Sequence, residues 1–229
     1  MLDIVQQLFC QMNENIKYVH FKSNEHLLEG LNGKTDLDLL VYGQDKEKMK
    51  IILNMLCFVL VISPKEQEYK DVEHWMGFDE ETGKLIHLHI YYKLITGKTY
   101  IKEIVLDWDE TAYKTSGFYL EDAKEVRIVS SEFEMLLLLT RTFYKASCSQ
   151  RLLYNINFTK HISPDVVREY EFLRKRLSVN KLETMLKELF PHIDDLTIKR
   201  IIKYLSDNNL CELYKSIKKT IVIENNFQK

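Results

Sequence analysis

Residues 17–42 read KYVHFKSNEHLLEGLNGKTDLDLLVY, and this stretch decides the fold. Polar and apolar side chains alternate over residues 17–22, which predicts a strand. Ser23 or Asn24 then suits the N-cap of a short helix over residues 25–31. The stretch therefore begins as a strand, a Ser-containing turn and a short helix.

The second half of the stretch carries two carboxylates. Asn32-Gly33 is a turn signal, and the alternating run over residues 35–42 predicts a strand that bears Asp36 and Asp38. Residues two apart on a strand share a face, so these carboxylates would stand about 7 Å apart at Cα. A hard cation such as Mg²⁺ would relieve their repulsion, although the motif alone also fits a pair of exposed acids.

Lys22-Ser23-Asn24 is a candidate phosphate-binding turn. Backbone N–H groups at the start of a helix bind anions, the Ser23 hydroxyl adds a donor and Lys22 adds charge. The alternative is a plain helix cap.

The flanking sequence predicts an α+β domain over residues 1–129. Helices are expected at residues 2–16 and 44–56, and strands at 58–63, 71–79 and 84–93. The last two strands are joined by Glu80-Glu81-Thr82-Gly83, which is typical of a hairpin. A mixed sheet with helices packed on it follows.

Residues 130–229 predict an all-α helical bundle. Ser131 with Glu134 resembles a capping box, and Ser163-Pro164 suits another helix start. Amphipathic patterns follow over residues 182–189 and 196–205, and a weak strand pattern covers 220–223.

Composition limits the classes of function. The 229-residue chain has a net charge of −2, which argues against binding nucleic acid through its overall charge. Its four cysteines are widely spaced among apolar residues, as in reduced core cysteines. No signal peptide or membrane span is expected, so we predict a cytoplasmic protein without a membrane partner.

Together, Phe21-Lys22-Ser23, twelve intervening residues and Asp36-Leu37-Asp38-Leu39 resemble the nucleotidyltransferase superfamily with the DNA polymerase β-like fold. Small bacterial nucleotidyltransferase-like proteins with a Lys-Ser-Asn turn are the nearer resemblance, over residues 17–110. It implies that Ser23 contacts nucleotide phosphate and that Asp36 and Asp38 hold the metals. A helical bundle after the catalytic domain also fits such proteins.

Two residues depart from the pattern. Lys22 replaces the usual Gly, and His87 stands where the third carboxylate is expected, with His89 in phase. His87 would act as a base, or both histidines would bind a transition metal, or they would only fill the strand face. A further alternative is that the site binds nucleotide without turning it over.

The sequence thus predicts transfer of a nucleoside monophosphate from an NTP to a hydroxyl acceptor, with Mg²⁺ as cofactor. Arg141 and Lys145, spaced i, i+4 on one predicted helix, would reach the triphosphate or form an exposed helix face. The rival prediction is a catalytically degenerate nucleotide-binding or partner module with the same fold. The expected acceptor is a small molecule or a macromolecule.

Overall fold

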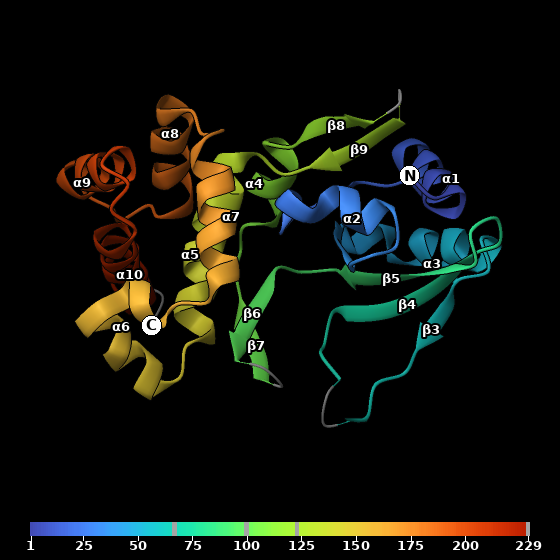
Figure 1. Ribbon diagram of the computed structural model, residues 1–229, viewed down its shortest axis with the longest axis horizontal. Helices are drawn as coiled ribbons and strands as arrows, with labels where there is room; N and C mark the ends of the chain where they lie inside the picture. Colours follow the sequence, from blue (N-terminus) through green and yellow to red (C-terminus); the bar gives the residue numbers. More distant parts are fainter. Residues whose placement is uncertain (66–67, 99–100, 122–123, 228–229) are drawn as a thin grey trace. The chain divides into compact units, whose positions relative to one another are not determined.

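The computed structural model of the protein is shown in Figure 1 and describes residues 1–65, 68–98, 101–121 and 124–227. The chain divides into two compact units. Unit 1 comprises Met1–Ile95 and Lys102–Ser130, and unit 2 comprises Thr96–Ile101 and Ser131–Lys229.

Unit 1 is built on a seven-stranded sheet. Its strands are β1 (Tyr18–His20), β2 (Leu37–Val41), β3 (Val59–Val61), β4 (Val72–Asp79), β5 (Lys84–Tyr91), β8 (Gly117–Glu121) and β9 (Lys124–Ile128). Its helices are α1 (Asp3–Asn15), η1 (Asn24–His26), α2 (Leu27–Leu31), η2 (Gly43–Asp45), α3 (Lys46–Met55) and α4 (Asp109–Lys114). A separate two-stranded sheet pairs β6 (Ile95–Lys98) with β7 (Ile101–Val105).

The strands of the larger sheet lie in the order β3-β4-β5-β2-β1-β9-β8. β4 and β5 form the predicted hairpin, and β1 runs antiparallel to β2. β5 runs parallel to β2, and β9 runs parallel to β1, so the sheet is mixed. The expected α+β class is confirmed.

One face of this sheet is buried in a hydrophobic core shared with α1 and α3 (Figure 1). The buried positions of α1 recur at helical spacing and are Val5, Leu8, Phe9 and Met12. On β2, Leu37, Leu39 and Val41 belong to the same core. Side chains alternate along a strand, so Asp38 points to the opposite face of the sheet.

Two glycines shape the connection from α2 to β2: Gly30 near the end of the helix and Gly33 in the turn that follows it. A Cβ on Gly30 would lie 2.7 Å from Leu37 Cδ2 and 3.3 Å from the Asp36 carbonyl oxygen, which is too close. Gly33 has a φ of +70°, the left-handed region that suits glycine, as the turn signal predicted. Gly30 therefore sets how closely α2 packs on the start of β2.

Unit 2 is helical apart from β6. Its helices are α5 (Ser131–Lys145), α6 (Cys148–His161), α7 (Pro164–Arg174), α8 (Val179–Leu189), α9 (Asp195–Ser206) and α10 (Leu210–Phe227). α5 packs on α7, α8 and α10, and α10 also packs on α6 and α9. In the described part of the chain, none of the helices has the length and apolar character needed to cross a bilayer.

Most expected elements are present, and the N-cap at Ser163 with Pro164 at the first helical position is confirmed. The strand expected over residues 220–223 is wrong, because this segment lies inside α10. Ser131 is the first residue of α5 rather than its cap. The strands β6, β7, β8 and β9 were not anticipated.

The expectation of core cysteines is wrong for two of them. Cys10 and Cys57 are exposed, and Cys211 is half-buried. Cys10 lies on the solvent side of α1, and Cys57 follows α3 in the left-handed conformation. Apolar neighbours in sequence do not decide burial, because the period of the element decides which residues face the core. The side chain of Cys148 lies outside the described residues.

Candidate functional site

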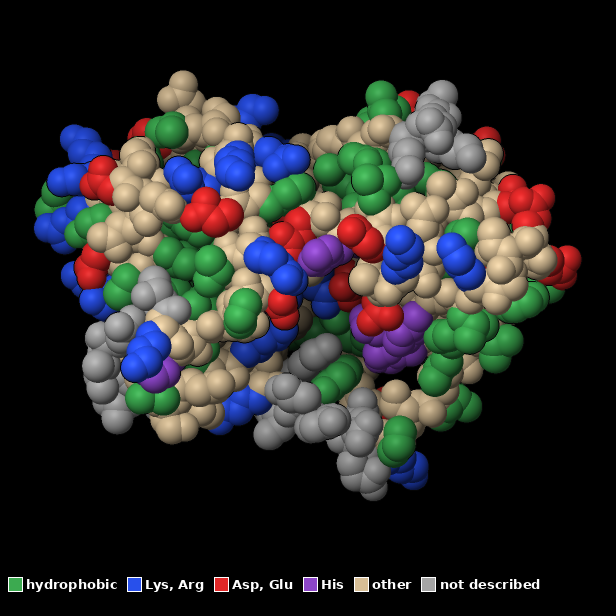
Figure 2. Space-filling view, viewed as in Figure 1, with side chains coloured by type: hydrophobic (Ala, Val, Ile, Leu, Met, Phe, Trp, Pro, Cys, Tyr) green, Lys and Arg blue, Asp and Glu red, His purple; other side chains and the backbone are tan. Residues whose placement is uncertain are grey.

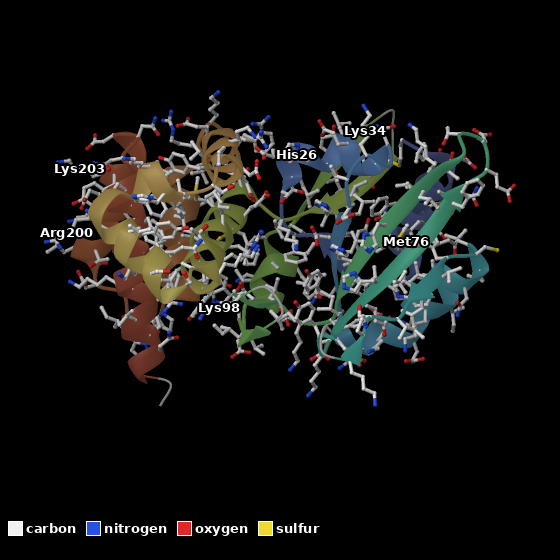
Figure 3. The ribbon with its side chains drawn as sticks, turned by 60° about the horizontal axis from the view of Figure 1, so that its bottom comes forward. His26, Lys34, Met76, Lys98, Arg200 and Lys203 are labelled. Atoms are coloured by element: carbon white, nitrogen blue, oxygen red, sulfur yellow. The ribbon has the colours of Figure 1, made fainter. Side chains whose placement is uncertain are left out.

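The register of β2, β5 and β4 brings acidic and histidine side chains into two adjacent rows. Asp38 pairs with His89, which pairs in turn with His74 on β4. His87 lies two residues before His89, and Asp36 two residues before Asp38, so both share the same face. Met76, the cross-strand partner of His87, is labelled on β4 in Figure 3. The sheet face opposite the core therefore carries the site.

Asp36 lies just before β2 and is the more open of the two carboxylates, with 48% of its side chain exposed. Its Oδ1 lies 3.0 Å from Nδ1 of His87, and its Oδ2 lies 3.6 Å from Nε2 of His89. Asp36 and His87, which are 51 residues apart in the chain, are thus brought together as expected.

Asp38 is nearly enclosed and already has a cationic partner. Its Oδ1 lies 2.7 Å from Lys22 Nζ and 3.1 Å from His89 Nδ1. Burial raises the pKa of the Asp38 carboxyl, but the Lys22 ammonium and His89 outweigh burial and hold the pKa well below its usual value. Asp38 is therefore a carboxylate whose charge is neutralised inside the protein.

Lys22 occupies the position that is glycine in the nucleotidyltransferase pattern, and its side chain points toward Asp38. Besides Asp38, its Nζ donates to the Tyr91 hydroxyl at 3.1 Å. The same nitrogen lies 4.8 Å from the centre of the Tyr91 ring and 5.3 Å from that of Phe21. The expected phosphate-binding lysine is thus held by Asp38 and by the rings of Phe21 and Tyr91, so Tyr91 belongs to the site.

The turn after Lys22 differs from a standard helix start. Ser23 has a φ of 57°, and its side chain makes no cap hydrogen bond. The expected helix is a single 3₁₀ turn followed by the five-residue α2, which is too short for a strong dipole. Asn24 Oδ1 lies 2.6 Å from Nδ1 of His20, which is fully buried. Burial lowers the pKa of His20, and its bond to Asn24 ties the turn to the sheet.

His74 is the site residue that the sequence reasoning missed. Its Nδ1 lies 3.3 Å from His87 Nε2, and its ring centroid lies 4.6 Å from that of His89. Histidine side chains gather at one place on the visible face, next to acidic ones (Figure 2). The hairpin register predicted from the loop at residues 80–83 contains the signal, because it places His74 opposite His89.

Three further acids on or near the neighbouring strands point away from the site and do not supply a third carboxylate there. Glu73 faces the other side of β4, where it accepts hydrogen bonds from Trp75 Nε1 and the Tyr92 hydroxyl. Asp79 accepts from the backbone of Ile4 and from Thr82. Asp109 accepts from the backbone N–H of Leu94, with their donor and acceptor atoms 2.9 Å apart. These acids fix local structure.

Arg141 and Lys145 both lie on α5 of unit 2, Arg141 half-buried and Lys145 exposed. The prediction that they reach a triphosphate bound to unit 1 stays a prediction. The basic residues Lys199, Arg200 and Lys203 lie exposed on α9 and form a solvated helix face. Arg200 and Lys203 are labelled in Figure 3.

No protein-family model matches the chain, and no curated protein matches it. Among solved structures, it is similar to the crystal structure of JHP933 from Helicobacter pylori. The two are 16% identical, the alignment covers 99% of this chain and 94% of that chain, and the TM-score is 0.34. At this TM-score the similarity supports no statement about fold or function, so the proposals below depend on the site itself.

Proposed function

We propose that the protein is a nucleotidyltransferase that moves a nucleoside monophosphate from an NTP to a hydroxyl acceptor with Mg²⁺ and releases pyrophosphate. Unit 1 is its polymerase β-like domain in this proposal. One observation carries the proposal: Asp36, Asp38 and His87 share one sheet face. His87 is bonded to Asp36 at 3.0 Å, and His89 contacts both acids. Residues expected from a sequence motif and residues from a distant strand thus meet in one place.

In this proposal Lys22 and the turn that follows it meet the triphosphate. A phosphate oxygen is an anion and would compete with Asp38 for Lys22 Nζ, which pairs with the carboxylate at 2.7 Å. When Lys22 turns to the phosphate, Asp38 Oδ1 becomes available to a cation. Lysine suits this exchange because its flexible stem carries a point charge rather than a rigid fork.

The donor set fits Mg²⁺ in part. Carboxylate oxygens are the ligands that this ion prefers, and Asp36 offers an open carboxylate. Asp38 Oδ1 is engaged by Lys22 and His89, so this residue fits the ion only after the exchange at Lys22. When bound, Mg²⁺ supplies charge neutralisation at the phosphates.

His87 is the proposed base. Asp36 accepts from Nδ1, so Nε2, which lies 3.3 Å from His74 Nδ1, takes the proton of the acceptor hydroxyl once the acceptor replaces His74 as its partner. The carboxylate also orients the ring, as an acid does for a catalytic imidazole.

Calorimetry with each of the four NTPs and Mg²⁺ tests the proposal. Wild type should bind one or more of them with a Kd in the range of roughly 1 μM to 1 mM, which is typical for enzyme substrates. The Asp36→Asn/Asp38→Asn variant should bind at least about tenfold more weakly, a loss equivalent to about 1.4 kcal/mol. Glu80→Gln/Glu81→Gln removes the same charge from the exposed hairpin loop and should bind like wild type. No binding by wild type, or equal binding by the site variant, rejects the proposal.

A second candidate is a nucleotide-binding module without turnover. The ion pair between Lys22 and Asp38 favours it, because one of the two expected metal ligands is already neutralised. The module is supported if the protein binds NTP but forms no labelled product when it is incubated with labelled NTP, Mg²⁺ and cell extract as the source of the acceptor. Turnover that His87→Ala abolishes would support the enzyme.

A further inference from the structure

We infer that His74, His87 and His89 form a binding site for a first-row transition ion of the Zn²⁺ class. The three residues each offer one ligand atom, and these atoms lie within 4.8 Å of one another. They come from two paired strands, whose backbone hydrogen bonds fix the positions from which the three side chains extend. The inference does not require the proposed transfer reaction.

The spacing of the nitrogens fits such an ion. Zn–N bonds of about 2.05 Å in a tetrahedron imply ligand nitrogens about 3.3 Å apart. His74 Nδ1 and His87 Nε2 already lie 3.3 Å apart. The His87 and His89 ring centroids lie 4.4 Å apart with the planes at 86°, so the rings converge without stacking flat on each other. Small rotations of the three half-exposed histidine side chains would bring all three ligand nitrogens to these distances.

Each of two histidines has a carboxylate behind it. Asp36 accepts from Nδ1 of His87, and Asp38 lies 3.1 Å from Nδ1 of His89. A carboxylate on one ring nitrogen fixes the tautomer and leaves the other nitrogen to a metal. For His89 that other nitrogen is Nε2, whose distance of 3.6 Å from Asp36 Oδ2 is too long for a hydrogen bond. The acids that the sequence suggested as magnesium ligands thus act here as orienting groups for the histidines.

Charge and ligand type define the class of ion. Three neutral imidazoles favour Zn²⁺, Co²⁺, Ni²⁺ or Cu²⁺ over Mg²⁺, which requires oxygen. The two carboxylates and Lys22 carry a net charge of about −1 next to the cluster, which favours a divalent cation over an anion. All three histidines are half-exposed, so an ion can enter from solvent and keep a water ligand.

Titration of the full chain with Zn²⁺ and Co²⁺, after dialysis against a chelator, tests the inference. Calorimetry should give one ion per chain, and bound Co²⁺ should show the intense visible absorption of a four-coordinate ion. His74→Ala should weaken Zn²⁺ binding at least about 100-fold, and Asp36→Asn about tenfold, since loss of an orienting carboxylate costs 10- to 100-fold. Far-ultraviolet circular dichroism confirms that each variant is folded.

His26→Ala is the matched control. His26 is also half-exposed and next to carboxylates, with Nε2 2.9 Å from Glu25 Oε1, but it lies on η1 away from β4 (Figure 3). This variant should bind Zn²⁺ like wild type. If wild type binds no Zn²⁺ or Co²⁺, or if both His74→Ala and His87→Ala bind as tightly as wild type, the inference fails. NTP calorimetry on the same preparations tests the proposed function separately, because Zn²⁺ binding and NTP binding can each be absent while the other is observed.

Discussion

Replacement of Lys22 by methionine tests whether this lysine neutralises Asp38 inside the protein. Methionine keeps an apolar stem against Phe21 and Tyr91 but removes the ammonium. The Lys22 and Asp38 side chains are only 15% and 13% exposed, and their charged atoms lie 2.7 Å apart. Removing one partner of a buried pair leaves an uncompensated charge and costs roughly 3–5 kcal/mol. Because His89 Nδ1 stays 3.1 Å from Asp38, we expect the low end, about 3 kcal/mol.

Urea unfolding followed by tryptophan fluorescence is the assay. Both tryptophans, Trp75 and Trp108, belong to unit 1, so the signal reports on the unit that contains the site. Glu110→Gln is the control, since Glu110 is 73% exposed and lies 2.9 Å from Lys17 Nζ. Breaking that surface pair should cost less than about 1 kcal/mol.

Adding Asp38→Asn to Lys22→Met should restore most of the lost stability, because the buried charge is then removed with its partner. The double-mutant cycle should give a coupling energy of about 1–3 kcal/mol. The reasoning is refuted if Lys22→Met costs no more than Glu110→Gln, or if the double variant is less stable than Lys22→Met alone.

Three further predictions concern Gly30 in α2, Asp79 at the end of β4, and His87, which is proposed both as a base and as a metal ligand. Gly30→Ala should lower the unfolding free energy by about 1–3 kcal/mol and weaken nucleotide binding, because its Cβ would lie 2.7 Å from Leu37 Cδ2; urea unfolding and calorimetry measure the two effects. Hydrogen bonds from Thr82 and Ile4 hold the pKa of Asp79 below its usual value, so the stability that Asp79 contributes is present above about pH 4 and lost as pH falls through the lowered pKa. Asp79→Asn should therefore flatten the pH dependence of unfolding below about pH 4, and an unchanged slope would contradict this. Saturating Zn²⁺ should slow nucleotidyl transfer at least about 100-fold without weakening NTP binding, because the ion occupies the nitrogen that takes the acceptor proton; equal rates with and without Zn²⁺ would separate the two roles.

Local patterns predicted the parts of the fold that local physics controls. Alternation and turn residues found β2, β4 and β5, and helical spacing found α1 and α3, because each of these elements buries one face. The edge strand β8 and its neighbour β9 lack that signal, and the pairing of β9 with β1 depends on contacts far along the chain, such as His20 with Ile128. The segment 220–223 was misread because β-branched residues favour strands, whereas burial of Ile221 against the bundle makes it helical.

The sequence predicted which site residues share a face of the same strand, but not which strands lie next to each other. Spacing alone predicted that Asp36 and Asp38 share a face and that His87 and His89 do. Their meeting depends on the parallel pairing of β2 with β5, which joins residues 51 apart and which no local pattern specifies. His74, in contrast, follows from the local hairpin, because the register set by the loop at residues 80–83 places it opposite His89. The direction of the Lys22 side chain was also beyond sequence reasoning, since a lysine after a strand points to solvent as readily as to an acid.

A crystal grown with Mn²⁺ and a non-hydrolysable NTP analogue tests the central claim most directly. Anomalous scattering at the manganese edge locates the ion, and the density locates the phosphates. We expect Mn²⁺ at about 2.2 Å from an Asp36 carboxylate oxygen, with a phosphate within hydrogen-bond distance of Lys22 Nζ in place of Asp38. Nucleotide bound elsewhere, or an intact pair between Lys22 and Asp38 with no ion at Asp36, would contradict it.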